Sequence, residues 1–196
     1  MKMSGNDLLR YSKQIILKQV GILGQKKISS TKVLIVGMGG LGCPVALYLS
    51  NLGIKNIGIV DRDRVDFSNL NRQILFNTKD IGKFKVTQAR KILQRGNKNV
   101  QIKTYKEKII KKNIHTILKK YEIICDCSDN FETRYLLNDF CLKNKKILIS
   151  AAINKFEAHI FNFDFKKNIP CYRCFMPEIP YLENTCDSEG LLPTVA

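Results

Sequence analysis

Residues 32–42 read K-V-L-I-V-G-M-G-G-L-G, an apolar, β-branched run followed directly by a glycine cluster. The run at 32–36 has the length and composition of a buried strand, and 41–52 has those of a helix that ends near Gly53. A strand, a glycine loop and a helix in this order are typical of the start of a βαβ unit. The sequence therefore predicts an α/β fold built outward from this stretch.

The glycines of this stretch have the spacing of a phosphate-binding loop. Gly37 permits a tight turn, Gly39 lets the backbone approach a phosphate, and Gly42 lets the helix pack on the strand. Gly40 completes the cluster, and the start of the helix offers free N–H groups to an anion. Asp61 ends the next predicted strand, where a carboxylate can bond ribose hydroxyls. We therefore expect a nucleotide site formed by this loop and this acid.

Strands and helices alternate along the rest of the chain. We expect further strands at 56–60, 100–105, 122–127 and 147–150, and helices at 83–94, 111–119 and 132–143. Such alternation requires right-handed crossovers and a mainly parallel sheet covered on both faces. The pattern at 156–165 fits an antiparallel strand, and 7–23 has the periodicity of an amphipathic helix. The predicted fold is therefore α/β: a doubly wound, mainly parallel, Rossmann-like sheet with an N-terminal helical arm and antiparallel C-terminal strands.

The size and composition of the chain are those of one globular domain, with 196 residues, 44% hydrophobic and 26% charged. We expect an arm at 1–30, a nucleotide-binding core at 31–165 and a loop-like region at 166–196. No apolar stretch reaches membrane-spanning length. The first residues, M-K-M-S-G-N-D, lack an apolar signal core, and the odd number of 7 cysteines is typical of reduced thiols. These features favour a soluble, cytoplasmic protein without membrane contact.

The chain is strongly basic, with 33 Lys and Arg against 17 Asp and Glu and a formal net charge of +16. A charge of this size favours polyanions, nucleotide phosphates or an acidic protein partner, and it does not distinguish among them. The basic residues are scattered rather than collected in an Arg-rich tract. Compositional drift is therefore an equal explanation for part of the charge.

The connection at 61–80 is too polar and too long for a plain βα loop, which indicates a function. Arg72 within it can fork two phosphate oxygens, and Lys85 in the next element supplies a point charge. Asp129 follows the strand predicted at 122–127, where a carboxylate faces the ligand crevice and can hold Mg²⁺ beside a triphosphate. Arg72, Lys85 and Asp129 are therefore the candidate catalytic residues, and they favour ATP over a nicotinamide dinucleotide.

Several motifs recur together in one order along the chain. They are R-Y-S-K-Q (10–14), the glycine loop with L-G-C, D-R-D-R-V-D-F-S-N-L-N-R-Q (61–73), G-K-F-K-V (82–86), D-C-S-D-N (126–130), C-Y-R-C (171–174) and T-C-D-S-E-G (185–190). In this order they resemble the ThiF/MoeB family of ubiquitin-activating-type adenylyltransferases, over essentially the whole chain.

The resemblance implies a nucleotide domain that uses MgATP to adenylate the C-terminal glycine of a ubiquitin-like sulfur-carrier protein ending in Gly-Gly, with release of pyrophosphate. The pathway would be thiamine or molybdenum-cofactor biosynthesis. By the same resemblance Asp61 binds the ribose and Asp129 binds Mg²⁺. The phosphates would be bound by Asn69, Arg72 and Lys85.

The resemblance also implies a homodimer, in which an arginine of the N-terminal motif reaches across to the partner's phosphates. Lys13 stands at that position here. Lysine keeps the positive charge and loses the planar fork, so we expect a weaker or differently aimed contact. A solvated lysine on a helix face is the alternative.

The cysteines divide into three groups. Cys171 and Cys174 form C-x-x-C, which is half of a Cys₄ zinc site. The family completes that site with a second C-x-x-C, which 175–196 lack. Either the chain is truncated, which we favour, or the second pair has been lost, so we expect only a zinc half-site. Cys186 matches a family thiol that links covalently to the carrier, although its acidic neighbours disfavour the thiolate and favour a spare loop thiol. Four others fit the core as small apolar residues: Cys43, Cys125, Cys127 and Cys141.

Three other functions compete with carrier adenylation. A tRNA-modifying dehydratase of the same fold would suit the basic charge, but the C-Y-R-C motif disfavours it, and nucleic acid is otherwise not an expected partner. A nicotinamide-dependent oxidoreductase is disfavoured by the phosphate-binding residues. A truncated module that binds ATP or carrier without turnover is the non-enzymatic alternative.

Overall fold

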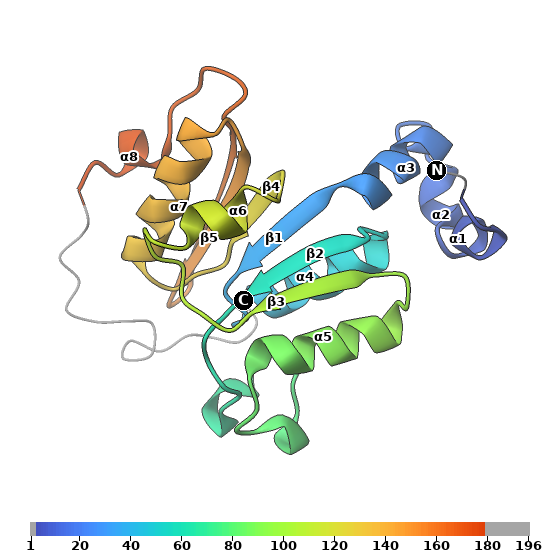
Figure 1. The fold of residues 1–196 in the computed structure, drawn as a ribbon, viewed down its shortest axis with the longest axis horizontal. Helices are drawn as coiled ribbons and strands as arrows, with labels where there is room; N and C mark the ends of the chain where they lie inside the picture. Colours follow the sequence, from blue (N-terminus) through green and yellow to red (C-terminus); the bar gives the residue numbers. More distant parts are fainter. Residues whose placement is uncertain (1–2, 179–196) are drawn as a thin grey trace.

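Short apolar strands form the core of the protein, and the central ones are buried on both faces. In the computed structural model, which describes residues 3–178, six strands form one sheet in the order β3-β2-β1-β4-β5-β6 (Figure 1). Their bounds are Lys32–Val36 (β1), Asn56–Val60 (β2), Gln101–Tyr105 (β3), Ile123–Asp126 (β4), Ile147–Asn154 (β5) and Glu157–Asp164 (β6). β1 to β5 run parallel, and β6 pairs antiparallel with β5. The predicted fold class is confirmed.

Helices cover both faces of this sheet. The main helices are α4 (Gly42–Leu52), α5 (Lys85–Gly96), α6 (Ile114–Leu118) and α7 (Phe131–Lys143). Ile35 of β1 is buried in one apolar cluster with residues of α4 and α5, and its neighbour Leu34 is buried in a second cluster with residues of α6 and α7. Successive strand residues therefore contact opposite helical layers, which explains why the strand sequence is apolar without a break.

The strand order reverses between β1 and β4. From β1 the chain continues through α4 to β2 and β3 on one side, whereas β4 pairs with the other side of β1. In doubly wound sheets such a reversal leaves a crevice at the carboxyl ends of the two strands, where ligands bind. Here those ends are Val36, just before the glycine loop, and Asp126.

The N-terminal arm differs from its prediction. The single helix expected at 7–23 is wrong, because the structure has α1 (Gly5–Arg10), α2 (Ser12–Ile15) and α3 (Gly21–Ser30) instead. The first break is at Tyr11, between α1 and α2. Tyr11 is 1% exposed, and its hydroxyl accepts a hydrogen bond from the Asn97 side chain at 3.1 Å. The second break is at Gly21, whose φ of +57° lies in the left-handed region.

The other predicted elements occur with shifted ends. β5 continues to Asn154, well beyond the expected 150, and the long connection after β2 contains two 3₁₀ turns, η1 (Phe67–Asn69) and η2 (Thr78–Asp80). A short helix, α8 (Tyr172–Phe175), lies in the region expected to be loop. Among the described residues, no helix has the length and apolar character needed to span a membrane.

Candidate nucleotide site at the glycine loop

The glycine loop is built so tightly that two of its glycines have no room for a side chain. Gly37 has φ +95°, and a Cβ there would lie 2.5 Å from the Cys127 carbonyl oxygen. A Cβ on Gly42 would lie 1.9 Å from the Gly37 oxygen. At Gly39 the nearest atom to such a Cβ is the Gln73 amide nitrogen at 4.0 Å. The first and last glycines are therefore needed for packing, while Gly39, like the half-buried Gly40, leaves the loop open to a ligand.

Asp61 ties this loop to the segment after β2. Its Oδ2 accepts a hydrogen bond from the Met38 N–H at 2.7 Å, and its Oδ1 accepts one from the Asp63 N–H at 2.7 Å. Burial raises the pKa of the Asp61 carboxyl, and the nearby Lys85 ammonium opposes that rise. The carboxylate thus lies beside the loop, as the sequence predicted, with both oxygens already accepting backbone N–H groups.

Lys85 begins α5 and points back toward the same acids. Its side chain is only 8% exposed, and its ammonium lies 3.3 Å from Oδ2 of Asp63. The Lys85 N–H also donates to the Asp63 carbonyl at 3.0 Å, so the start of α5 is held against the strand end. The Lys85 ammonium is therefore buried close to Asp61, and its ion-pair partner Asp63 is exposed.

Asn69 is the last residue of η1, and Arg72 lies in the turn that follows it. The Asn69 carbonyl accepts the N–H groups of Arg72 at 3.1 Å and Gln73 at 2.9 Å. The half-buried Arg72 guanidinium donates to the Ser68 carbonyl at 3.1 Å. Asn69 and Arg72 are therefore placed by one backbone turn.

Gln73 is a site residue that the sequence analysis did not assign. It is 3% exposed, and within the described residues its Oε1 is a buried side-chain atom without a hydrogen-bond partner. Its amide nitrogen is the nearest atom to the open side of Gly39. Gln73 therefore presents its side-chain amide beside the open loop, and its oxygen retains the capacity to accept a hydrogen bond. In the sequence, the only signal was its place directly after Arg72.

A buried charge network supports the loop that carries Asp129. Asp126, at the end of β4, is fully buried and accepts hydrogen bonds from the hydroxyls of Ser128 at 2.5 Å and Ser150 at 2.7 Å. Arg134 of α7 lies 3.7 Å from Asp126 and donates to the Ser128 carbonyl at 2.9 Å. Asp129 itself is exposed, beyond this rigid turn. Neither Asp126 nor Arg134 was predicted as a supporting residue.

Lys13 is not brought to the other predicted site residues within one chain. It is exposed on α2, and its neighbours in the arm contact the C-terminal ends of α4 and α5: Arg10 donates to the Gly96 carbonyl at 2.9 Å, and Gln14 donates to the Leu52 carbonyl at 3.2 Å. These helix ends lie at the opposite end of the sheet from the glycine loop.

The cysteine predictions have mixed outcomes. The Sγ atoms of Cys171 and Cys174 lie 3.8 Å apart. Between residues 3 and 178, no group of three or more His, Cys, Asp or Glu side chains is arranged to hold a metal ion. Cys186 lies outside the described residues. The expected core cysteines are all buried: Cys43, Cys125, Cys127 and Cys141.

Known proteins share this architecture and sequence. The ThiF family model matches residues 11–196. "Adenylyltransferase and sulfurtransferase MOCS3" of Culex quinquefasciatus is 41% identical over 99% of this chain and 44% of the relative, and its namesake in Xenopus laevis is 41% identical over 96% and 42%. The structure of PaaA has a TM-score of 0.77 at 25% identity, covering 87% of this chain and 55% of PaaA. Escherichia coli MccB with ATP has a TM-score of 0.75 at 26% identity, covering 84% and 50%.

The chain therefore spans less than half the length of the curated relatives that it matches. Within that span the agreement runs from the arm through the glycine loop to the last residue. By its sequence and by its doubly wound sheet, the chain belongs to the ThiF family.

Proposed function

We propose that this chain adenylates the C-terminal glycine of a ubiquitin-like sulfur-carrier protein with MgATP and releases pyrophosphate. The observation that carries the proposal is that Lys85 and the buried side-chain amide of Gln73 lie beside the open glycine loop at the switch point of the sheet. The MOCS3 relatives are named adenylyltransferases, and MccB has been crystallised with ATP.

The residues at the loop have the donor chemistry that ATP requires. The N–H groups at the start of α4 and the Lys85 ammonium suit phosphate oxygens, and Asp61 suits the ribose. Asn69 at the end of η1 and Arg72 in the turn after it would bind the phosphates. Asp129 would bind Mg²⁺, which when present neutralises phosphate oxygens.

The reaction then needs positioning and charge neutralisation more than proton transfer. A carrier carboxylate oxygen attacks the α-phosphorus of ATP, the bond from that phosphorus to the bridging oxygen of the β-phosphate breaks, and pyrophosphate leaves. The carboxylate is already ionised at pH 7, so no general base is required. Lys85 and Arg72 would stabilise the charge that develops on the phosphate oxygens.

A homodimer is part of the same proposal. Lys13 is too far along the molecule to serve the glycine loop of its own chain, so we infer that it serves the loop of a second copy. Large apolar side chains on the arm support a contact there, since Leu9 is 78%, Ile16 71% and Leu23 80% exposed.

The cysteines contribute less to this proposal. Two thiols at Cys171 and Cys174 do not fit a complete zinc site, which takes four ligands, so zinc would need ligands from outside residues 3–178. We keep Cys186 as a candidate covalent thiol. Neither thiol site enters the adenylation step.

Exchange of labelled pyrophosphate into ATP tests the proposal directly. The protein, MgATP and a Gly-Gly-ended carrier should support exchange, and the same carrier without its last glycine should not. Lys85→Ala and Asp129→Ala should abolish exchange, whereas the exposed neighbour control Lys83→Ala should retain it. Exchange that is absent in the wild type, or unchanged by both substitutions, would rule the proposed reaction out.

A further inference from the structure

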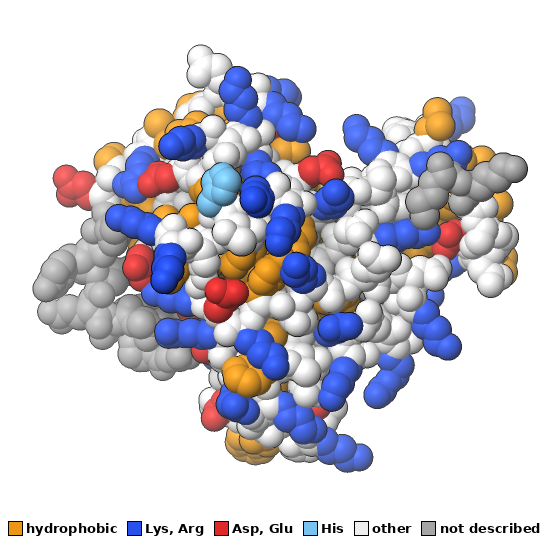
Figure 2. All heavy atoms as spheres, viewed as in Figure 1, with side chains coloured by type: hydrophobic (Ala, Val, Ile, Leu, Met, Phe, Trp, Pro, Cys, Tyr) orange, Lys and Arg blue, Asp and Glu red, His pale blue; other side chains and the backbone are white. Residues whose placement is uncertain are grey.

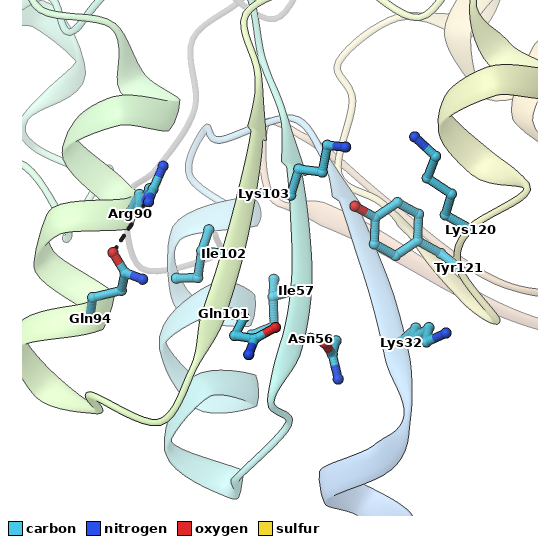
Figure 3. A pocket seen from close by; sticks show the side chains of 10 residues that line it. All are labelled: Lys32, Asn56, Ile57, Arg90, Gln94, Gln101, Ile102, Lys103, Lys120 and Tyr121. Carbon is cyan, nitrogen blue, oxygen red and sulfur yellow. Dashed lines mark hydrogen bonds between the residues drawn. The ribbon is translucent and has the colours of Figure 1, made fainter.

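A second concave site lies at the end of the sheet opposite the glycine loop. It has a volume of about 440 Å³, and the first residues of three neighbouring strands line it: Lys32 of β1, Asn56 of β2 and Gln101 of β3 (Figure 3). The glycine loop follows the last residue of β1. A five-residue strand separates the two sites by roughly 17 Å, so they do not share a ligand.

The lining of this amino-end pocket is cationic. Lys32, Lys103, Lys120 and Arg90 all contribute to it, and none of its lining residues is Asp or Glu. Within residues 3–178, none of these four cations forms a salt bridge. On the face of the molecule drawn in Figure 2, Lys and Arg side chains are widespread, and Asp and Glu side chains are few. Within the described part of the chain, ion pairs therefore do not balance the positive charge of this lining.

Two of the lysines lie against each other. Lys103 projects from β3 and Lys120 precedes β4, and Figure 3 shows their ammonium groups directed toward one another. The Lys103 ammonium holds the pKa of Lys120 below its ordinary value. Like charges at contact distance repel unless an anion lies between or over them. A bound anion would relieve this repulsion.

The floor of the pocket is rigid. The Tyr121 ring lies over Gly58, where a Cβ would come within 2.4 Å of the ring, and the Tyr121 hydroxyl is 3.1 Å from that of Tyr105. Tyr121 is 6% exposed, so its ring is not free to stack on a base. Arg90 donates to the Gln94 side chain at 3.2 Å, which holds its guanidinium at the pocket edge. A small hollow with exposed cations at its rim and a buried aromatic ring suits a compact anion better than an extended strand of nucleic acid.

We propose that this amino-end pocket binds a small polyphosphate anion, held by Lys32, Lys103 and Lys120 with Arg90 at its edge. Lysine binds phosphate as a point charge without a strict geometry, and the side-chain amides of Asn56 and Gln101 add neutral donors. The volume lies within the range of small-molecule sites, which is about 300 to 1,000 Å³. This role is independent of the adenylation reaction.

Titration with inorganic tripolyphosphate, followed by the backbone amide signals of the full chain in NMR, tests the proposal. We expect signals from 101–103 and 119–121 to shift at saturable concentrations, separately from any shift at 37–42. In the double variant Lys103→Gln and Lys120→Gln, the Kd obtained from the first set of shifts should rise about tenfold. The matched control is the double variant Lys166→Gln and Lys167→Gln. These two lysines are exposed beyond β6, so the control removes the same charge at the other edge of the sheet. The control should change the Kd less than about twofold.

Two polymeric anions distinguish a small polyphosphate from an acidic protein or RNA as the ligand. A 20-residue poly-glutamate and a 20-nucleotide oligo(U) are each titrated at the same salt concentration. Weak binding of both, insensitive to the pocket substitutions, supports a small polyphosphate. Equal or tighter pocket-dependent binding of either polymer overturns the assignment in favour of an acidic protein or RNA. A Kd for tripolyphosphate that rises alike in both double variants reduces the effect to overall charge.

Discussion

The glycines of the loop are of two kinds. Some occupy positions with no room for a side chain, and others leave space for a ligand. A Cβ at Gly42 would lie 1.9 Å from the Gly37 oxygen, whereas one at Gly39 would contact nothing closer than 4.0 Å. We expect Gly42→Ala to lower the unfolding free energy by about 2 kcal/mol or more, because backbone must move. Gly39→Ala should leave stability within about 0.5 kcal/mol and weaken ATP binding, since its methyl group enters the phosphate space. Urea unfolding and calorimetric ATP titration measure both; equal loss of stability in the two variants would contradict this.

Gln73 offers a second residue-scale prediction. Its Oε1 is buried without a partner in residues 3–178, so the side chain is held at a cost in the absence of ligand. Gln73→Met keeps the volume and removes the orphan. We expect the unfolding free energy to stay equal or rise by up to about 1 kcal/mol, while the Kd for ATP increases about tenfold. If the unfolding free energy fell by more than about 1 kcal/mol and the Kd for ATP were unchanged, Gln73 would be a packing residue only.

At the scale of elements, Arg134 joins α7, β4 and β5. Besides Asp126 and Ser128, it donates to the Ser150 hydroxyl at 3.1 Å and to the Ala151 carbonyl at 2.9 Å. Arg134→Gln strands a fully buried carboxylate, so we expect a loss of about 3 kcal/mol or more in unfolding free energy. Adding Asp126→Asn should restore part of it, and the exposed Arg95→Gln serves as control. If the losses of unfolding free energy caused by Arg134→Gln and by Asp126→Asn were strictly additive in the double variant, the two residues would not be coupled.

The C-Y-R-C segment is attached to α7 by an exposed ion pair. Arg173 donates to both oxygens of Asp139, at 2.8 and 2.7 Å, and this lowers the pKa of Asp139. Because the folded pKa is lowered, the stabilisation is complete above the unfolded pKa of about 3.9 and is lost as the pH falls through the folded value. Exposure limits it to about 1 kcal/mol. The stability difference between wild type and Asp139→Asn, from urea unfolding, should therefore be present at pH 6 and absent near pH 2; a difference that persists at pH 2 would refute the ion-pair origin.

The sequence predicted the repeating elements well because each strand carries its own apolar pattern, as at Lys32–Val36. It failed where a single side chain decides the structure. Tyr11 has the spacing of a helix face, but its ring turns inward against Gly53, where a Cβ would lie 2.8 Å from it, and the arm breaks there. Asp126 and Arg134 were missed for a related reason: their partners, Ser150 and Ala151, come from a different strand. Such contacts depend on the tertiary fold, which local pattern does not contain.

At the scale of the whole molecule, the place of Lys13 on the arm leads us to infer that the proposed reaction takes place in a dimer. If Lys13 serves the partner's glycine loop, Lys13→Ala and Lys85→Ala should each be inactive as homodimers. Mixed in equal amounts and allowed to exchange subunits, they should recover about a quarter of wild-type pyrophosphate exchange, because half the dimers are mixed and each holds one intact site. Lys18→Ala, a nearby exposed lysine on the arm, should stay active alone. An active Lys13→Ala homodimer would make Lys13 a solvated surface residue, whereas an inactive mixture, with subunit exchange verified by mass spectrometry, would place both lysines in the same site or remove the dimer from the mechanism.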